Sequence, residues 1–247
     1  MAGTLAYLGS TRINAAGIYL AEHRAELNPF TEVSGSIPTA SVQMYFDSAD
    51  WDGASSTLLG RYANATASLT SVTVGANGAL NFMTSSRLTT TASGDTTPNQ
   101  ATTSTIFAIY ASSGSATDYH GRLLTSIGTN WLFGTYGGAF PPTVTETMYS
   151  WFNNQFVIDS GSYDTVFHMM VGIRHSTTSA SVYIDNVYKT GSLATNGGFD
   201  GLAVNPPPSV PDERTQANVG VFGVYNRELS PSEITELYNN YKTKYGL

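Results

Sequence analysis

Short runs of apolar and β-branched residues, each ended by a cluster of Gly, Asn, Asp or Ser, recur from residue 41 to the end of the chain. The runs follow one another about every 8–12 residues, and no helical pattern separates them before the C-terminus. Strands at this spacing pair directly with their sequence neighbours rather than through helical crossovers. The pattern therefore predicts an all-β fold, an antiparallel two-sheet jelly-roll sandwich.

The segment VFHMMVGIRH, residues 166–175, shows the strand pattern most clearly. Its apolar side chains alternate and so share one face of a strand: Phe167, Met169, Val171 and Ile173. A hairpin is predicted directly afterwards, at 179–192. There Asp185-Asn186 forms the tight turn between two strands rich in Tyr and β-branched residues.

The composition excludes several classes of function. Charged residues make up 12% of the chain, about half the usual 25% of a soluble domain. A net charge of −7 with 11 Lys and Arg argues against nucleic-acid binding, which needs clustered basic groups. No apolar stretch is long enough to span a membrane, and no basic amphipathic segment suggests membrane binding. The absence of Cys excludes a disulfide scaffold and thiol chemistry.

Residues 1–40 differ from the rest and are interpreted as an N-terminal arm, ahead of a single domain at 41–247. AYLGSTRIN and IYLAEHRAE repeat with a period of 12, which aligns three pairs: Tyr7 with Tyr19, Leu8 with Leu20 and Arg12 with Arg24. Each unit fits a short strand, but residues 18–27 fit a helix as well. SGSIPTA at 34–40 reads as a linker. The first residues lack the pattern of a signal peptide, so we expect a protein made in a cytoplasm.

The C-terminal stretch VFGVYNRELSPSEITELYNNY, residues 221–241, combines a strand, a turn and a capped helix. Ser230 is the predicted N-cap, Pro231 fills the first helical position, and Glu233 completes a capping box. The helix carries an apolar stripe at helical spacing: Ile234, Leu237, Tyr238 and Tyr241. A helix this short is marginal alone, so we expect the stripe to dock on the sandwich and to seal one end of it.

The order of motifs in this ending resembles the C-terminus of the laminin-G-like jelly rolls in the concanavalin A-like lectin and glucanase superfamily. Further landmarks similar to those of the family are VQMYFDSAD, GALNFMTSSRLTT, TSTIFAIYASS and the segment 166–192. In that segment Phe167 stands for the family's Trp, His168 for its His, and Asn186 for its turn Gly. The resemblance implies the fold over about residues 41–247. It implies no activity, because the superfamily holds hydrolases, lectins and structural modules.

The N-terminal repeat resembles the short leading repeats of bacteriophage virion proteins. AYLGSTRIN matches that pattern, whereas IYLAEHRAE has Ala in place of Gly and of Ile. The resemblance implies a virion structural protein, a decoration, cement or fibre module on head or tail. The arm would contact other virion proteins, and a homo-oligomer is expected, with a trimer as the commonest form. The arm residues expected to bind are Tyr7, Leu8, Arg12, Ile13, Tyr19 and Leu20.

Catalytic patterns were sought among the 18 acidic and 4 His residues. A retaining glycosidase on this fold presents carboxylates along one strand, as Glu-x-Asp-x-x-Glu, and no such run exists. The histidines lack metal-site spacing and are interpreted as structural. From these absences we predict that the chain is not an enzyme and has no cofactor apart from Ca²⁺ at the site considered next.

The stretch FDSADWDG holds the best candidates for a ligand site. Asp47, Asp50 and Asp52 offer oxygens for Ca²⁺, although the favoured interpretation is a turn in which they bind local backbone donors. Trp51 is the best candidate for sugar stacking, because it lies in a polar turn. These residues support the alternative function, a carbohydrate-binding module of a phage tail that contacts host surface glycans.

Overall fold

The computed structural model describes residues 37–62, 65–91, 103–113, 123–125, 127, 133–137, 147–151, 156–161, 165–176, 179–190, 201–205 and 214–247. All of them belong to the larger of the two units into which the chain divides, Val33–Leu247. The arm residues named above lie outside the described part, so the arm and its partners stay predictions. Within the described part, no helix has the length and apolar character needed to cross a membrane.

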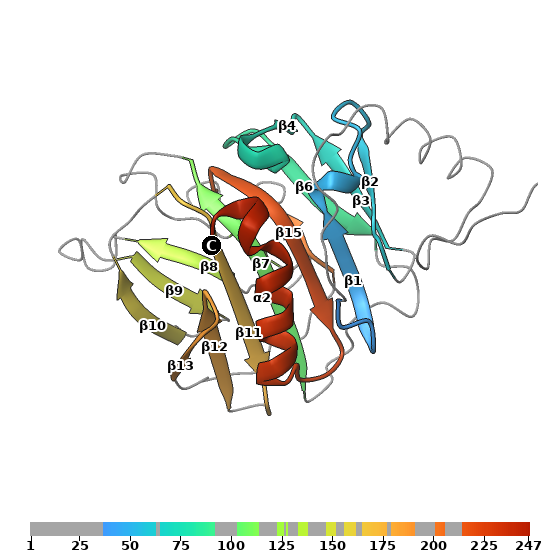
Figure 1. The fold of residues 1–247 in the computed structure, drawn as a ribbon. Coiled ribbons are helices and arrows are strands. Elements are labelled where there is room, and N and C mark those ends of the chain that lie inside the picture. The colour runs from blue at the N-terminus through green and yellow to red at the C-terminus, as the bar shows by residue number, and fades with distance from the viewer. Residues whose placement is uncertain are drawn as a thin grey trace, which may run out of the picture. The chain divides into compact units, whose positions relative to one another are not determined.

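The larger of the sheets has eight strands, all in antiparallel pairs, and runs β13-β12-β11-β7-β15-β5-β4, with β1 also paired to β15 (Figure 1). Its strands are β1 (Val42–Asp47), β4 (Thr73–Val74), β5 (Leu80–Phe82), β7 (Ser104–Ser112), β11 (His168–Arg174), β12 (Ala180–Ile184), β13 (Val187–Thr190) and β15 (Ala217–Tyr225). The first residues of β15 pair with β5 and the rest pair with β1, so the two short strands share one edge of a long one.

A second layer faces this sheet and consists of two smaller antiparallel groups. One is β14-β6-β3-β2 and the other is β10-β9-β8. Leu124 bridges to Phe133 in β8, and Thr125 bridges to Ala203 in β14, so two adjacent residues connect the groups. The strands are β2 (Thr57–Leu59), β3 (Thr66–Thr70), β6 (Arg87–Thr91), β8 (Phe133–Gly137), β9 (Thr147–Trp151), β10 (Phe156–Gly161) and β14 (Ala203–Val204). The predicted antiparallel sandwich is confirmed.

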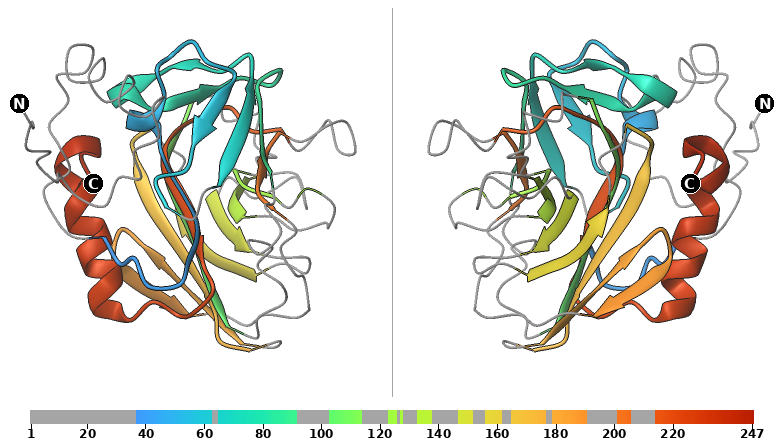
Figure 2. Two further views of the ribbon diagram at one scale, coloured as in Figure 1. Left: turned by 90° about the vertical axis from the view of Figure 1, so that its right-hand side faces the viewer. Right: turned by 90° about the vertical axis from the view of Figure 1, so that its left-hand side faces the viewer.

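The C-terminal helix α2 (Pro231–Tyr245) begins as the sequence predicts. The Ser230 side chain accepts from the Glu233 backbone, and the Glu233 side chain accepts from the Ser230 backbone, which forms the capping box. The prediction that the helix seals an end of the sandwich is wrong. The helix lies across the outer face of the larger sheet, on the side opposite the second layer (Figure 2), because its stripe packs on a second apolar face of that sheet.

The larger sheet is therefore buried on both faces, and the side chains of β7 alternate between the two. Residues Ile106, Ala108 and Tyr110 point into the core between the layers. Their neighbours Phe107, Ile109 and Ala111 belong to the cluster beneath α2. The predicted alternating face of 166–175 is confirmed, since its four residues all lie in the cluster under the helix. A strand that serves two cores reads as continuously apolar, as IFAIYA within β7 does.

The hairpin predicted around Asp185-Asn186 is also confirmed. β12 and β13 are joined by these two residues, whose φ angles are 49° and 66°. Positive φ at both central positions is typical of the type I′ turn, whose twist matches that of paired strands. The turn fixes the register, so that Ile184 pairs with Val187 and Tyr183 pairs with Tyr188.

Candidate functional site

A cleft of about 450 Å³ opens between the β12–β13 hairpin and the turn that leads into α2. The hairpin side contributes aromatic rings, and the turn contributes charged and hydroxyl groups. The cleft is lined by Ile173, His175, Ser181, Tyr183, Tyr188, Arg227, Glu228, Leu229, Ser230, Pro231 and Glu233. An apolar wall with convergent polar groups is the usual form of a small-ligand site.

Two tyrosines form the aromatic wall. The rings of Tyr183 and Tyr188 meet edge to face, with 5.3 Å between their centroids and 66° between their planes. Tyr188 is 54% exposed, whereas Tyr183 is partly buried. Burial raises the pKa of Tyr183, and the neighbouring Tyr188 raises it further, so this phenol stays neutral. The pair therefore offers a rigid apolar surface with hydroxyl groups at its rim.

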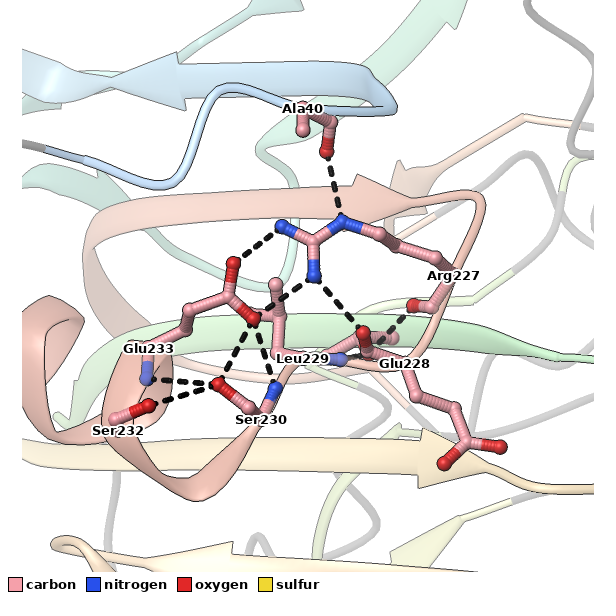
Figure 3. A network of polar contacts seen from close by, with 8 residues as sticks. Ala40, Arg227, Glu228, Leu229, Ser230, Ser232 and Glu233 are labelled. Atoms are coloured by element: carbon pink, nitrogen blue, oxygen red, sulfur yellow. Dashed lines mark hydrogen bonds and ion pairs between the residues drawn. The ribbon is translucent and has the colours of Figure 1, made fainter.

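Arg227 and Glu233 form a closed pair on the opposite wall (Figure 3). The Arg227 Nη2 lies 2.5 Å from Glu233 Oε1, and Nη1 donates to Oε2 at 2.8 Å. Arg227 also donates from Nε to the Ala40 carbonyl at 3.0 Å and from Nη1 to the Glu228 carbonyl at 2.9 Å. The hydrogen bonds from Arg227, followed by those from Ser230, lower the pKa of Glu233 to about 2. The pair is thus held in its charged form.

His175 connects Glu228 to Ser181. Its Nδ1 lies 2.9 Å from Glu228 Oε2, and its Nε2 lies 2.9 Å from the Ser181 hydroxyl. An ionised carboxylate only accepts, so Nδ1 donates to Glu228, and Nε2 makes the second hydrogen bond with the Ser181 hydroxyl. This order of atoms resembles a serine nucleophile with its base. Ser181 is 2% exposed and lies within β12, so the arrangement mainly holds His175, which in turn fixes the Glu228 carboxylate.

The Glu228 carboxylate points away from the Arg227–Glu233 pair in Figure 3 and is 42% exposed. The cleft thus places an exposed tyrosine ring, an oriented carboxylate and the Ser230 hydroxyl on one small surface. These groups are suited to a ligand with one apolar face and several hydroxyl or amino groups. Among the residues that the structure describes, no three His, Asp or Glu side chains gather as a group that would hold a metal ion.

The three aspartates proposed for Ca²⁺ all bind other groups of the protein. Asp47 is buried against Arg61 Nη2 at 3.1 Å and Lys244 Nζ at 3.5 Å. Asp50 accepts from Arg61 Nε at 3.0 Å. Asp52 accepts from the backbone of residues 54 and 55, as the favoured interpretation predicts. The carboxylates do not converge, because two of them bind one guanidinium and the third caps its own turn.

Trp51 has a structural contact that the sequence does not reveal. Its indole N–H donates to the Ser55 carbonyl at 2.7 Å, and the partly buried ring packs against the core between the layers. A glycan-binding role for Trp51 stays a prediction. It lies outside the cleft described above, whose lining includes none of the residues proposed from the sequence.

The cleft residues were missed because they are far apart along the chain, at 173–188 and 227–233. One signal was available. A two-residue turn at Asp185-Asn186 pairs Tyr183 with Tyr188, so both rings must lie on the same face of the hairpin. The contact between His175 and Glu228 left no such signal, because the two residues are 53 positions apart in the sequence.

No family model matches the sequence, and no curated protein matches it significantly. Solved structures do match. Trypanosoma rangeli sialidase superposes with a TM-score of 0.62 at 14% identity over 92% of this chain. A receptor-binding domain superposes at 0.57 with 12% identity over 81% of this chain. The binding domain of botulinum neurotoxin DC, in complex with SialylT, superposes at 0.56 with 10% identity over 81% of this chain.

At these identities the likeness shows the fold. It is consistent with the concanavalin A-like sandwich that the C-terminal motifs predict. The chain spans 38% of the length of the sialidase and about half the length of the binding domains, 50% and 52%.

The comparison corrects the prediction that the chain is not an enzyme. Sialidases are enzymes, and this chain shares its fold with part of one. The sequence search tested one arrangement, carboxylates spaced along a single strand. Its failure says nothing of sites built from several elements, such as the cleft lined by β11, β12, β13 and the start of α2.

Proposed function

We propose that this chain is a carbohydrate-binding module and that the cleft between the β12–β13 hairpin and α2 holds the sugar. The observation that carries the proposal is the exposed Tyr188 ring beside the oriented carboxylate of Glu228 in one open cleft. The structural likeness to a toxin binding domain in complex with SialylT supports a lectin-like module.

Binding would use both walls of the cleft. The C–H face of a sugar ring would stack on Tyr188, which Tyr183 holds in place through their edge-to-face contact. Glu228, fixed by His175, would accept hydrogen bonds from sugar hydroxyl groups, and the exposed Ser230 hydroxyl would add another. Since the His175 contact fixes Glu228 before binding, less side-chain entropy would be lost on binding.

Titration of the purified chain against a glycan array, followed by calorimetry with the best ligand, tests this proposal. Tyr188→Ala should weaken binding about tenfold, because it removes the stacking surface. Tyr188→Phe should retain most of the affinity, since the ring remains. Met83→Ala is a matched control, because Met83 is also a large exposed apolar side chain, at 48%, and lies outside the cleft. Equal effects of Tyr188→Ala and Met83→Ala would reject the cleft as the site.

We propose further that the module is carried on a bacteriophage particle through its N-terminal arm. The support is the sequence resemblance of residues 6–14 to virion leading repeats, together with the division of the chain into a short first unit, Met1–Glu32, and a larger one, Val33–Leu247. Deletion of residues 1–33 should leave a folded domain that no longer joins particles. Normal incorporation of the truncated chain into virions would reject the anchoring role.

A further inference from the structure

The guanidinium that lines the cleft, that of Arg227, already binds a carboxylate of the protein itself. A sugar carboxylate is usually recognised by a guanidinium whose two parallel N–H groups are free for it. In this cleft Arg227 directs that pair of N–H groups at Glu233, with contacts of 2.5 and 2.8 Å. An anionic sugar would have to displace the Glu233 carboxylate from Arg227. The same carboxylate also takes part in the capping box at the start of α2.

The start of α2 is occupied in the same way. A helix N-terminus attracts anions through its unpaired backbone N–H groups. Here the Ser230 side chain accepts from the Glu233 N–H, and the Glu233 carboxylate accepts from the Ser230 N–H at 2.8 Å. The capping box therefore satisfies two of the donors that an anionic ligand would otherwise find.

The charge left facing the cleft is negative. Its lining holds one guanidinium, from Arg227, and two carboxylates, from Glu228 and Glu233. Pairing of Arg227 with Glu233 leaves Glu228, 42% exposed, as the charge that a ligand meets. His175 binds one carboxylate oxygen of Glu228, Oε2, at 2.9 Å, which leaves the other oxygen for a ligand. The net charge of −7 on the chain adds to the repulsion of anions.

We infer that the cleft selects sugars that bear a free amino group, such as glucosamine units, over their N-acetylated counterparts, and that it discriminates against sialylated glycans. This inference rests on the proposed function. The ammonium group would form a charge-assisted hydrogen bond with Glu228 while the ring stacks on Tyr188. A cation held above a tyrosine face would gain a further attraction from its π system. The toxin binding domain of similar fold is, by contrast, in complex with SialylT.

Calorimetry with three trisaccharides tests the inference: a glucosamine trisaccharide, its N-acetylated counterpart, and sialyllactose. The amine should bind about fivefold more tightly than the N-acetylated sugar, and sialyllactose should bind least tightly. Glu228→Gln should remove this preference, by lowering the affinity for the amine about fivefold more than the affinity for the N-acetylated sugar. Glu236→Gln removes the same charge from α2 outside the cleft lining and is the matched control.

The outcomes separate the two proposals. If the N-acetylated sugar binds through Tyr188 but the amine shows no advantage, the selectivity is rejected and the carbohydrate-binding function stands. The selectivity is also rejected if sialyllactose binds as tightly as the amine. It is likewise rejected if Glu236→Gln acts as strongly as Glu228→Gln, since long-range charge would then be the cause. If none of the three binds and the array finds no ligand, both proposals are rejected.

Discussion

The hydroxyl of Tyr241 donates a 3.1 Å hydrogen bond to Oδ2 of Asp47, and so ties the C-terminal helix to the end of the first strand, 194 residues earlier. Tyr45 lies 2.5 Å from the same hydroxyl and must be the donor there, because the Tyr241 proton goes to Asp47. Burial, followed by the charge of Asp47, raises the pKa of Tyr241 well above its ordinary value. The phenol therefore remains a donor to a carboxylate that is 0% exposed.

The first prediction concerns this contact. Tyr241→Phe should lower the free energy of unfolding by about 2 kcal/mol, because a buried carboxylate loses a donor and Tyr45 loses its acceptor. Urea denaturation measures the change. Tyr238→Phe is the control on the same helix, since Tyr238 is only partly buried against the same cluster. Equal stability of the two variants would show that the contact contributes nothing.

The sequence predicted the local features of the C-terminal helix but not the polar contacts that Asp47 makes with it. The helix start at Ser230, its apolar stripe and the strand before it follow from spacing and residue type, which act over a few positions. The contacts of Asp47 with Arg61, Lys244 and Tyr241 depend on how strands and helix come together. An Asp in a polar turn reads as exposed, and only the tertiary structure buries it.

A second prediction concerns Gly220, the extra residue at a bulge where the register of β15 against β7 shifts between Val219 and Val221. A Cβ added at Gly220 would lie 2.3 Å from Cζ of Tyr245, so the ring occupies the space of a side chain. Gly220→Ala should lower the free energy of unfolding by about 1–3 kcal/mol by displacing Tyr245.

A double-mutant cycle checks the cause. Tyr245→Ala removes the clash, so the double variant should be less destabilised than the sum of the single changes, by about 1 kcal/mol or more. Strict additivity would mean that Gly220 is required for the bulge itself rather than for the packing of Tyr245.

The pH dependence of stability gives a third prediction. Hydrogen bonds from Arg227 lower the pKa of Glu233 from its ordinary value of 4.5 to about 2. The contribution of Glu233 to stability is therefore fully present above pH 4.5, and it is lost as the pH falls towards 2, because the unfolded chain takes up the proton first. The stability advantage of the natural protein over Glu233→Gln should shrink across this window.

Urea denaturation at several pH values measures that advantage, with Glu236→Gln as a carboxylate control on the same helix. A difference between the natural protein and Glu233→Gln that stays constant from neutral pH to pH 2 would contradict the assignment. It would mean that the Arg227 pair does not lower the pKa of Glu233 in the folded protein.

The candidate site was less predictable than the fold, for a physical reason. The sequence search favoured residues that are chemically distinctive in their local segment, which directed it to FDSADWDG. The cleft is instead made of ordinary residues from a hairpin and a helix turn, and the larger sheet brings them together. Two pairs of its residues follow from rules that act within the sequence: Tyr183 and Tyr188 from the two-residue turn, and Ser230 and Glu233 from the capping box.

The last prediction separates the two aromatic candidates. Trp51→Ala should lower the free energy of unfolding by about 2–4 kcal/mol, because the ring packs on the core and its N–H binds the Ser55 carbonyl at 2.7 Å. Glycan affinity should stay unchanged at a temperature where the variant is folded. Trp51→Phe keeps most of the packing and should cost less, which isolates the hydrogen bond. Paired denaturation and calorimetry measure both properties; a Trp51→Ala protein of natural stability that no longer binds glycan would place the binding surface at the turn rather than at the cleft.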